Sequence, residues 1–242
     1  MQHGTDTDRR GGGPLAVVAA SVEVLGHPRA DERLLTDGER ERAARFRQEA
    51  TRRDFVAAHI LVRLCAARLI GATATEVTLA QSCPGCGKAD HGKPYLPDHP
   101  GVHVSISHTK GVVAAAAGYR EVGVDVELAE RTGTHPDVLE RVLTEGELRL
   151  VEKHTDPQRA FLRQWVRKEA LIKIGRLTLD TMGAVDLSAL PLAAVDGVPL
   201  RSRFEELHLL DWDDEKYQAT AAVVSPDEPR AVDLAELADL VG

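Results

Sequence analysis

The sequence predicts an α+β fold of two similar α/β lobes related by a pseudo-twofold axis, because three patterns of its first half return in order in its second half. LLTDGE returns as VLTEGE, 108 residues later from Thr36 to Thr144. RDF returns as RAF, 106 residues later from Arg53 to Arg159. VVAAAAG, around residue 113, returns as TAAVVS about 107 residues later. This duplication predicts a junction between two related units, which is a favoured place for a ligand.

The composition indicates a globular protein: the 242 residues are 43% hydrophobic and 28% charged. We expect a polar, Gly-rich tail over residues 1–13, a first lobe over 14–120 and a second lobe over 121–242. The net charge of −8 argues against binding nucleic acid through a broad basic surface. Three cysteines fit a reducing cytosol, and no apolar run reaches the ~18 residues of a membrane span. We therefore expect a cytoplasmic protein without a membrane partner.

Apolar periodicity and end signals place the elements of the first lobe. Residues 15–25, LAVVAASVEVL, are typical of a strand. Thr36 and Glu39 form a capping box that opens a helix. Residues 52–71 form a second, mostly apolar helix that ends in glycine. Three strands are expected to follow, at 102–107, 112–119 and 121–128.

Residues 83–100 are rich in Cys, Gly and Pro, and we expect a loop there. Cys83 and Cys86, followed by His91, have half of the spacing of a zinc knuckle. A structural zinc site normally needs four ligands, and the remaining cysteine, Cys65, falls in a predicted helix. The pattern therefore favours a rigid Pro/Gly turn, with a zinc site as the alternative.

Residues 159–177 are predicted to form the helix around which the chain is organised. At about 100° per residue its apolar side chains share one broad arc, which also contains Glu169 and Lys173. Charged side chains that point toward a core are costly unless a partner neutralises them, so we expect Glu169 to meet a charged group. The opposite side of the helix carries Arg163, Gln164, Arg167 and Lys168.

Alternation along the strand GVDVEL sends Asp125 and Glu127 to one face. Two carboxylates on one strand face can share a hard divalent cation, and an ordinary solvated face is the alternative. Glu169 would bring a third carboxylate, and three carboxylates with phosphate oxygens and water make a natural Mg²⁺ shell. Lys173, one turn beyond Glu169, is a candidate for neutralising a phosphate or for pairing with that acid.

A cluster of donors lies around the end of the strand at 102–107. Their chemistry suits an anionic ligand such as a phosphate, and a polar hairpin with an incidental histidine is the alternative. The donors are those of Lys93, Ser107, His108 and Lys110.

In order and spacing, these segments resemble the signature blocks of a known family. GKPYLPDHPGVHVSISHT, GVDVE and WVRKEALIK, from about residue 92 to 173, are similar to the three blocks of surfactin-type 4′-phosphopantetheinyl transferases. The resemblance implies the two-lobed fold of that family and an enzyme of the holo-[acyl-carrier-protein] synthase type. Such an enzyme moves the 4′-phosphopantetheine arm of coenzyme A to a serine of an apo acyl or peptidyl carrier protein and releases 3′,5′-ADP.

The resemblance also implies a role for each candidate residue. Asp125, Glu127 and Glu169 would ligate Mg²⁺, or Mn²⁺, together with the pyrophosphate of coenzyme A. The acceptor serine must lose its proton, and our hypothesis is that Glu169, or a metal-bound water that it orients, is the base. Lys173 would contact the pyrophosphate and stabilise the leaving group, while Lys93, Ser107 and His108 would hold the nucleotide and its phosphates.

The sequence departs from the family on the first long helix. The family usually has an Arg there that contacts the 3′-phosphate of coenzyme A, and that position holds Asp54. Either the start of the helix is shifted, or Arg52 or Arg53 reaches the phosphate instead. Arg42 is a further candidate for a phosphate contact.

The expected partners are coenzyme A and an acidic apo carrier protein, and we expect a monomer. The arginines at 40, 42, 45 and 47 are candidates for docking the carrier, or are simply the solvated face of a helix. Two other functions stay open at this point. One is a metal-dependent nucleotide phosphoesterase built from the same acids, and the other is a non-catalytic coenzyme A-binding protein.

Overall fold

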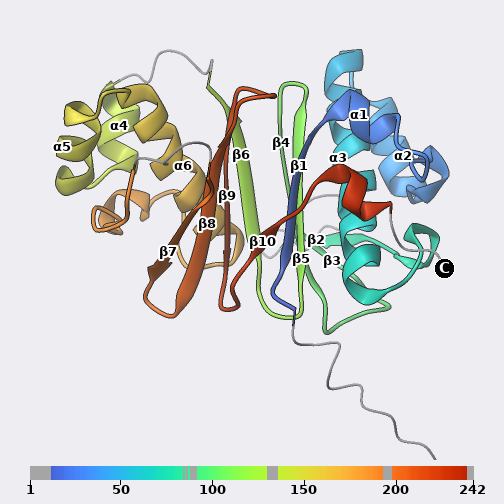
Figure 1. Cartoon of the computed structure of the whole chain (residues 1–242). Helices are drawn as coiled ribbons and strands as arrows, with labels where there is room; N and C mark the ends of the chain where they lie inside the picture. The colour runs from blue at the N-terminus through green and yellow to red at the C-terminus, as the bar shows by residue number, and fades with distance from the viewer. Residues whose placement is uncertain are drawn as a thin grey trace, which may run out of the picture.

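The computed structural model describes residues 12–83, 85, 87, 92–129, 136–192 and 198–238. Two four-stranded sheets lie at the centre, and helices cover the outer side of each sheet (Figure 1). The predicted α+β fold of two similar α/β lobes is confirmed. The expected N-terminal tail lies, up to residue 11, outside the described residues, and the lobe boundaries drawn from the sequence stay a prediction.

The first sheet has the strand order β10-β1-β5-β4. β5 runs antiparallel to both β1 and β4, whereas β10 runs parallel to β1. The last described part of the chain therefore returns to the first sheet, where Val232 and Leu237 join its core. The strands are β1 (Leu15–Ala20), β4 (His103–Thr109), β5 (Val112–Gly118) and β10 (Arg230–Ala231).

The strand expected over 15–25 is shorter than predicted. β1 ends at Ala20, which lies opposite Val112, the first residue of β5. Its ladder partner turns away at this point, and Ser21 begins α1 (Ser21–Leu25). The other helices of this lobe are η2 (Glu32–Leu34), α2 (Asp37–Ala44), α3 (Glu49–Ile70), η3 (Ala74–Glu76) and η5 (Leu234–Leu237).

The expected loop at 83–100 also contains a strand. β3 (Lys93–Tyr95) pairs antiparallel with β2 (Ala80–Ser82) and forms a small separate sheet. Three residues with a Pro in the middle give little periodicity, so pairing with β2 rather than local pattern defines this strand.

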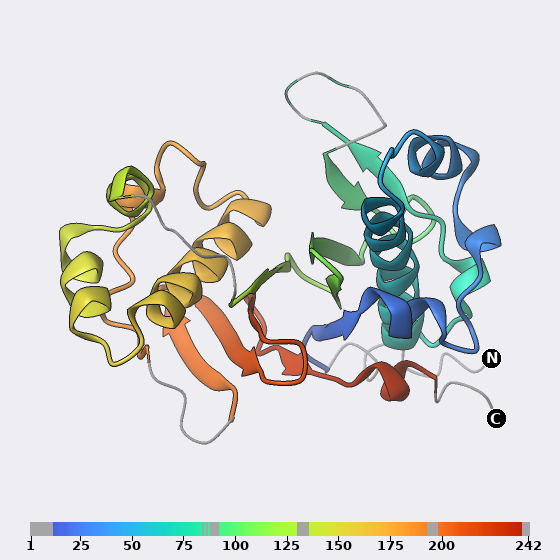
Figure 2. The same cartoon turned by 90° about the horizontal axis from the view of Figure 1, so that it is seen from above.

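The second sheet has the strand order β6-β9-β8-β7, and all its neighbours are antiparallel. The repeated segment TAAVVS lies in β9, which forms an antiparallel hairpin with β8. In the view from above, α6 lies along the outer side of this sheet as α3 does on the first lobe (Figure 2). The elements are β6 (Gly123–Leu128), α4 (Pro136–Val142), α5 (Glu145–Lys153), α6 (Pro157–Lys173), η4 (Met182–Ala184), β7 (Leu200–Phe204), β8 (Leu207–Asp214) and β9 (Ala219–Ser225).

Small side chains let the two sheets pack face to face. Ala114 and Ala116 of β5 join the core between the sheets, whereas Ala115 faces the core under α3. Gly123 of β6 lies against α6 so closely that a Cβ there would be 2.1 Å from the carbonyl oxygen of Ala170. Close packing on both faces of these strands explains why they are apolar and small. None of the helices in the described parts of the chain is long and apolar enough to cross a membrane.

Both lobes use a capping-box glutamate to hold a buried cation of the long helix. Glu39, which caps α2 at Thr36, binds the guanidinium of Arg63 with Nη2–Oε2 and Nη1–Oε1 distances of 2.6 and 3.1 Å. Glu147, which caps α5, accepts a 2.6 Å hydrogen bond from the ammonium of Lys168. Both cations are fully buried. Arg63 and Lys168 therefore play the same structural part in the two lobes.

The polar side of α6 is buried rather than exposed to solvent. Arg163 and Arg167 both bind the carboxylate of Asp211 on β8, and all three side chains are buried. Arg167 also donates to the carbonyl oxygen of Pro191 at 2.6 Å. Desolvation lowers the pKa of Arg167, and the charge of Asp211 opposes that shift. The helix is enclosed on both sides, so its polar residues form an internal ion-pair network.

The buried side chain of His59 makes the stability of the fold depend on pH. Its ring stacks on Phe55 at a centroid distance of 3.9 Å, and burial lowers its pKa to about 4, against the opposing charge of Glu39. The unfolded chain binds a proton near pH 6.5, whereas the folded protein does not until about pH 4. His59 therefore leaves stability unchanged above pH 6.5 and lowers it as the pH falls toward 4, by roughly 3 kcal/mol in total.

We expect His59→Leu to flatten this part of the pH profile. Urea unfolding at intervals from pH 7.5 to 4 measures the slope, with His154→Gln as a control at a more exposed histidine. An unchanged slope in His59→Leu would remove His59 from this role.

Candidate functional site

Two serines of β4 join the edges of the two sheets. Ser105 Oγ accepts a hydrogen bond from the backbone N–H of Val124 at 3.0 Å. Ser107 Oγ accepts from the backbone N–H of Val126 at 3.4 Å and donates to Asp125 Oδ1 at 2.7 Å. The predicted residues Ser107 and Asp125 thus meet at the junction of the lobes.

Lys173 reaches the same junction from the last turn of α6. Its ammonium donates to the carbonyl oxygens of Val124 and Ile106 at 2.6 and 3.1 Å and to Asp125 Oδ1 at 2.9 Å. The lysine side chain keeps 25% exposure, whereas that of Asp125 keeps 8%. Lys173 therefore holds β4, β6 and α6 together and pairs with Asp125, which the sequence had not predicted as its partner.

Asp125 retains one oxygen that suits a cation. Its Oδ2 is buried and accepts no hydrogen bond from the described protein atoms. Glu127 lies two residues further along β6, and Glu169 lies on α6, which packs against that strand; both side chains are half-buried. However, the described residues contain no group of three or more His, Cys, Asp or Glu side chains placed to hold a metal ion. The predicted ligand set of Asp125, Glu127 and Glu169 is not a ready-formed metal centre and stays a prediction.

His108 lies one residue beyond Ser107, near the end of β4. Part of His108 is exposed to solvent. The protein atoms around its ring nevertheless desolvate the imidazole, which disfavours the charged form and lowers its pKa. The negative charge of Asp54 opposes this shift, and the positive charges of Lys173 and Arg42 add to it. His108 is thus within electrostatic reach of groups from α2, α3 and α6.

The remaining predicted nucleotide contacts lie on the first lobe. The guanidinium of Arg42 lies 5.1 Å from the centroid of the Phe55 ring, and donates to Gln81 of β2 at 3.3 Å. Arg42, Phe55 and Tyr95 line a cavity of about 730 Å³ between α2 and the β2–β3 pair. Lys93 is exposed on β3, and its positive charge adds to desolvation in lowering the pKa of His103.

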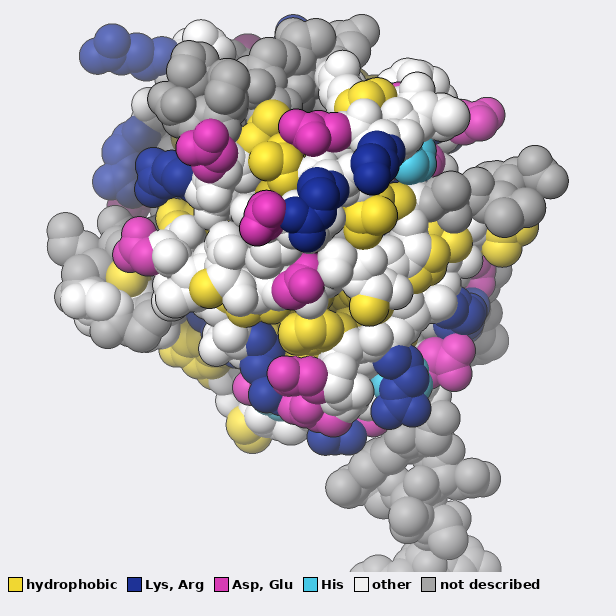
Figure 3. All heavy atoms as spheres, turned by 90° about the vertical axis from the view of Figure 1, so that its left-hand side faces the viewer, with side chains coloured by type: hydrophobic (Ala, Val, Ile, Leu, Met, Phe, Trp, Pro, Cys, Tyr) yellow, Lys and Arg dark blue, Asp and Glu magenta, His cyan; other side chains and the backbone are white. Residues whose placement is uncertain are grey.

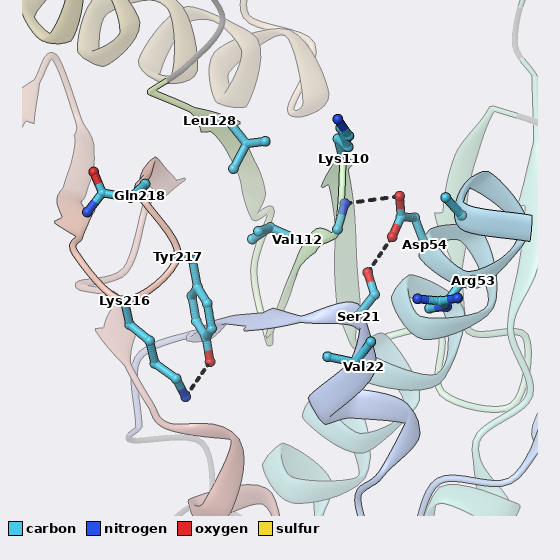
Figure 4. Close-up of a pocket in the computed structure, with 12 residues that line it drawn as sticks. Ser21, Val22, Arg53, Asp54, Lys110, Val112, Leu128, Lys216, Tyr217 and Gln218 are labelled. Atoms are coloured by element: carbon cyan, nitrogen blue, oxygen red, sulfur yellow. Dashed lines mark hydrogen bonds between the residues drawn. The ribbon is translucent and has the colours of Figure 1, made fainter.

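A second cavity, of about 490 Å³, lies where α1, α3, the β4–β5 turn and the β8–β9 turn meet (Figure 4). Arg53 is half-buried and lines it, as do Lys110 and Leu128. Sequence reasoning missed the acceptor in its wall: Asp54, buried, accepts hydrogen bonds from Ser21 and from the turn. A carboxylate within a mostly apolar helix was the signal that could have identified it.

A network across the lobes closes one side of this cavity. Glu23 of α1 accepts a hydrogen bond from the Tyr217 hydroxyl and forms a 2.7 Å ion pair with Lys216. Hydrogen bonds from Lys216 and Tyr217 are the main cause that lowers the pKa of Glu23. The β8–β9 turn of the second lobe is thereby fastened to the first.

The arginines proposed for carrier docking differ in what they do. Arg40 binds Asp37 and the carbonyl oxygen of Leu35, and Arg42 stacks on Phe55, whereas residues 45 and 47 are exposed. On the side of the second lobe away from the junction, basic and acidic side chains are interspersed with apolar ones (Figure 3). The exposed large apolar side chains of that lobe include Val138, Leu150 and Leu179.

The predicted zinc alternative falls largely outside the described residues, since Cys86 and His91 are not among them. Cys83 is half-buried and Cys65 is buried in α3. Burial raises the pKa of the Cys65 thiol to about 12, so this cysteine stays protonated and packs as an apolar group.

Comparison with known proteins finds matches to one family of enzymes. Residues 121–222 match the model of a family described as the 4′-phosphopantetheinyl transferase superfamily. A 4′-phosphopantetheinyl transferase of Bacillus subtilis is 29% identical over 136 residues, which are 55% of this chain and 57% of that relative. The 4′-phosphopantetheinyl transferase ffp of Bacillus subtilis is 35% identical over 86 residues, 35% of this chain and 38% of the relative. The chain thus matches just over half the length of the first and less than two-fifths of the second.

Proposed function

We propose, from the match of residues 121–222 to the model of the 4′-phosphopantetheinyl transferase superfamily, that this protein is a surfactin-type enzyme that acts on coenzyme A. It transfers the 4′-phosphopantetheine arm to a serine of an apo acyl or peptidyl carrier protein and releases 3′,5′-ADP. The observation that carries the proposal is the convergence of Ser107, Lys173 and Asp125 at the junction of the lobes. Three elements there supply an acid, a cation and a hydroxyl to one point.

The donor set supports a magnesium requirement. The buried Oδ2 of Asp125 has no hydrogen-bond partner among the described protein atoms, so a divalent cation would satisfy it, and carboxylate oxygens are the ligands that Mg²⁺ prefers. We propose that Asp125, Glu127 and Glu169 hold the ion together with pyrophosphate oxygens of coenzyme A. The ion would offset the charge that develops on the phosphate of 3′,5′-ADP as the pyrophosphate bond breaks. Pyrophosphate oxygens would supply further ligands beside these carboxylates.

Lys173 is proposed to neutralise the charge that builds up on the leaving 3′,5′-ADP when the pyrophosphate bond breaks. Its ammonium is partly exposed and already fixed by Asp125 and two backbone carbonyls, so it lies in a set position before the substrate arrives. A preorganised cation costs no rearrangement during the reaction, and positioning with charge neutralisation supplies most of the catalysis of phosphoryl transfer.

The nucleotide is proposed to lie on the first lobe. His108 and Arg42 would contact phosphates, and Lys93 with the cavity beside Arg42, Phe55 and Tyr95 would accept the rest of the nucleotide. The buried Ser107 hydroxyl is engaged by Asp125, so its proposed contribution to nucleotide binding is through the position of β4. Arg53, at the second cavity, is the proposed contact to the 3′-phosphate.

One assay tests the function. The protein is incubated with coenzyme A, Mg²⁺ and an apo carrier protein, and the carrier is weighed by mass spectrometry. A gain of one phosphopantetheine is the expected result. Free phosphopantetheine with an unchanged carrier would indicate a nucleotide phosphoesterase, and no product with bound coenzyme A would indicate a non-catalytic binding protein.

Replacing Glu169 by glutamine is expected to lower kcat at saturating Mg²⁺ by about 10²-fold or more, because a general base typically contributes 10²–10⁴-fold. The amide keeps the size of the side chain and removes the proton acceptor. Steady-state transfer to the carrier measures kcat, and a Mg²⁺ titration separates loss of the base from weaker metal binding.

Glu152→Gln on α5 is the matched control, since it makes the same change at an exposed glutamate. A Glu169→Gln protein with near-native turnover would show that another group accepts the proton.

A further inference from the structure

We propose that Asp54 is a positioning residue for the nucleotide side of the site: its carboxylate fastens the β4–β5 turn to α1 and α3 and so fixes the end of β4 that carries His108. The inference rests on the proposed coenzyme A transfer. It concerns the position at which the sequence departs from the family, where an acid takes the place of a phosphate-binding arginine.

The carboxylate is part of a closed ring of hydrogen bonds. Ser21 Oγ donates to Asp54 Oδ1 at 2.6 Å, and the backbone N–H of Gly111 donates to Asp54 Oδ2 at 3.1 Å. The backbone N–H of Ser21 donates to the carbonyl oxygen of Gly111 at 2.9 Å, which closes the ring. Figure 4 shows Asp54 between Ser21 and the turn that carries Lys110. Both oxygens are therefore satisfied by neutral donors.

Each member of the ring comes from a different element. Ser21 is the first residue of α1, Asp54 lies near the start of α3, and Gly111 lies in the two-residue turn between β4 and β5. Gly111 has a φ of +77°, a left-handed conformation that favours glycine. The ring thus holds the turn in one conformation at the point where β1 and β5 stop pairing.

This turn determines where His108 lies. Only Thr109 and Lys110 separate His108 from Gly111, and His108 pairs with Val113 across the same hairpin. The charge of Asp54 also raises the pKa of His108, whereas the charges of Lys173 and Arg42 lower it. A buried carboxylate beside a phosphate site would repel the ligand if it pointed into that site. Because its two oxygens are engaged by Ser21 and Gly111, its role is to hold the histidine rather than to contact coenzyme A.

The test is Asp54→Asn, which keeps the shape of the side chain but replaces one acceptor by a donor, so that one of the two hydrogen bonds is lost. We expect KM for coenzyme A to rise about fivefold, because the turn and the end of β4 that carries His108 are then held by one hydrogen bond fewer. We expect kcat and KM for the carrier to stay within twofold. The pKa of His108, followed by NMR titration, should fall because the opposing negative charge is gone.

Ser21→Ala keeps the charge of Asp54 and removes one hydrogen bond. It should raise KM for coenzyme A less and leave the pKa of His108 nearly unchanged, and it also serves if Asp54→Asn does not fold. Asp98→Asn, at an exposed carboxylate of the same lobe, is the control and should change none of these quantities.

The NMR titration needs no turnover, so it separates this inference from the proposed reaction. The inference would be overturned if Asp54→Asn changed neither the pKa of His108 nor KM for coenzyme A. If Asp54→Asn does not fold, an unchanged KM for coenzyme A in Ser21→Ala would overturn it instead. A lowered pKa in a protein that transfers no phosphopantetheine would leave the role of Asp54 standing and reject the reaction.

Discussion

Lys168→Met is expected to lower the free energy of unfolding by about 3–5 kcal/mol, the range typical of breaking a buried ion pair from one side. The ammonium of Lys168 is fully buried and donates to Glu147, to the carbonyl oxygen of Val142 and to that of Met182, at 2.6, 2.7 and 2.9 Å. Methionine keeps the length of the side chain but leaves a buried carboxylate and two carbonyls without this donor.

Urea unfolding at pH 7 measures the loss, with Lys153→Met as the control at an exposed lysine of α5. The double variant Lys168→Met, Glu147→Gln should recover part of the stability, because no buried charge is then left unpaired. A loss below about 1 kcal/mol in Lys168→Met would mean that water reaches the freed groups and that the pair is not as buried as described.

Lys173→Met is expected to lower kcat/KM by about 10²–10³-fold, as for the removal of one preorganised charge-stabilising donor. The substitution removes the cation proposed to face the pyrophosphate and leaves Asp125 Oδ1 with Ser107 as its remaining described partner. Transfer to the carrier gives kcat/KM, and calorimetry with coenzyme A reports whether binding or turnover is lost.

Lys173 also ties β4 to β6, so its loss could act through the fold alone. Thermal unfolding of Lys173→Met therefore accompanies the kinetics, and Lys173→Arg, which keeps the charge, should retain more activity than Lys173→Met. Equal activity of Lys173→Met and the native protein would exclude Lys173 from catalysis, whatever the change in stability.

The candidate site shows how far sequence reasoning reaches. Alternation in β6 predicted that Asp125 and Glu127 share a face, and the resemblance grouped Asp125 with Ser107 and Lys173, which the structure brings together. The sequence did not predict that Lys173 binds Asp125 directly, because that contact depends on how α6 crosses β6. Gly123, where a Cβ would lie 2.1 Å from the Ala170 carbonyl oxygen, allows this close crossing.

The sequence by itself determined the local and repeated features. Capping boxes at Thr36 and Thr144 fix two helix starts through contacts within three residues, and apolar periodicity places α3, α6 and the hairpins. The internal repeat then determined the two-lobed α+β architecture. These signals need only neighbouring residues, so they can be read before the chain is folded.

The tertiary structure alone decided which charges are buried and what they bind. Arg163 and Arg167 have the periodicity of an exposed helix side, yet they bind Asp211, more than forty residues away. Asp54 meets Ser21 and Gly111 in the same way, across 33 and 57 residues. Such pairs leave no local pattern, because the free energy that favours them comes from desolvation and partner geometry that exist only once the lobes have packed.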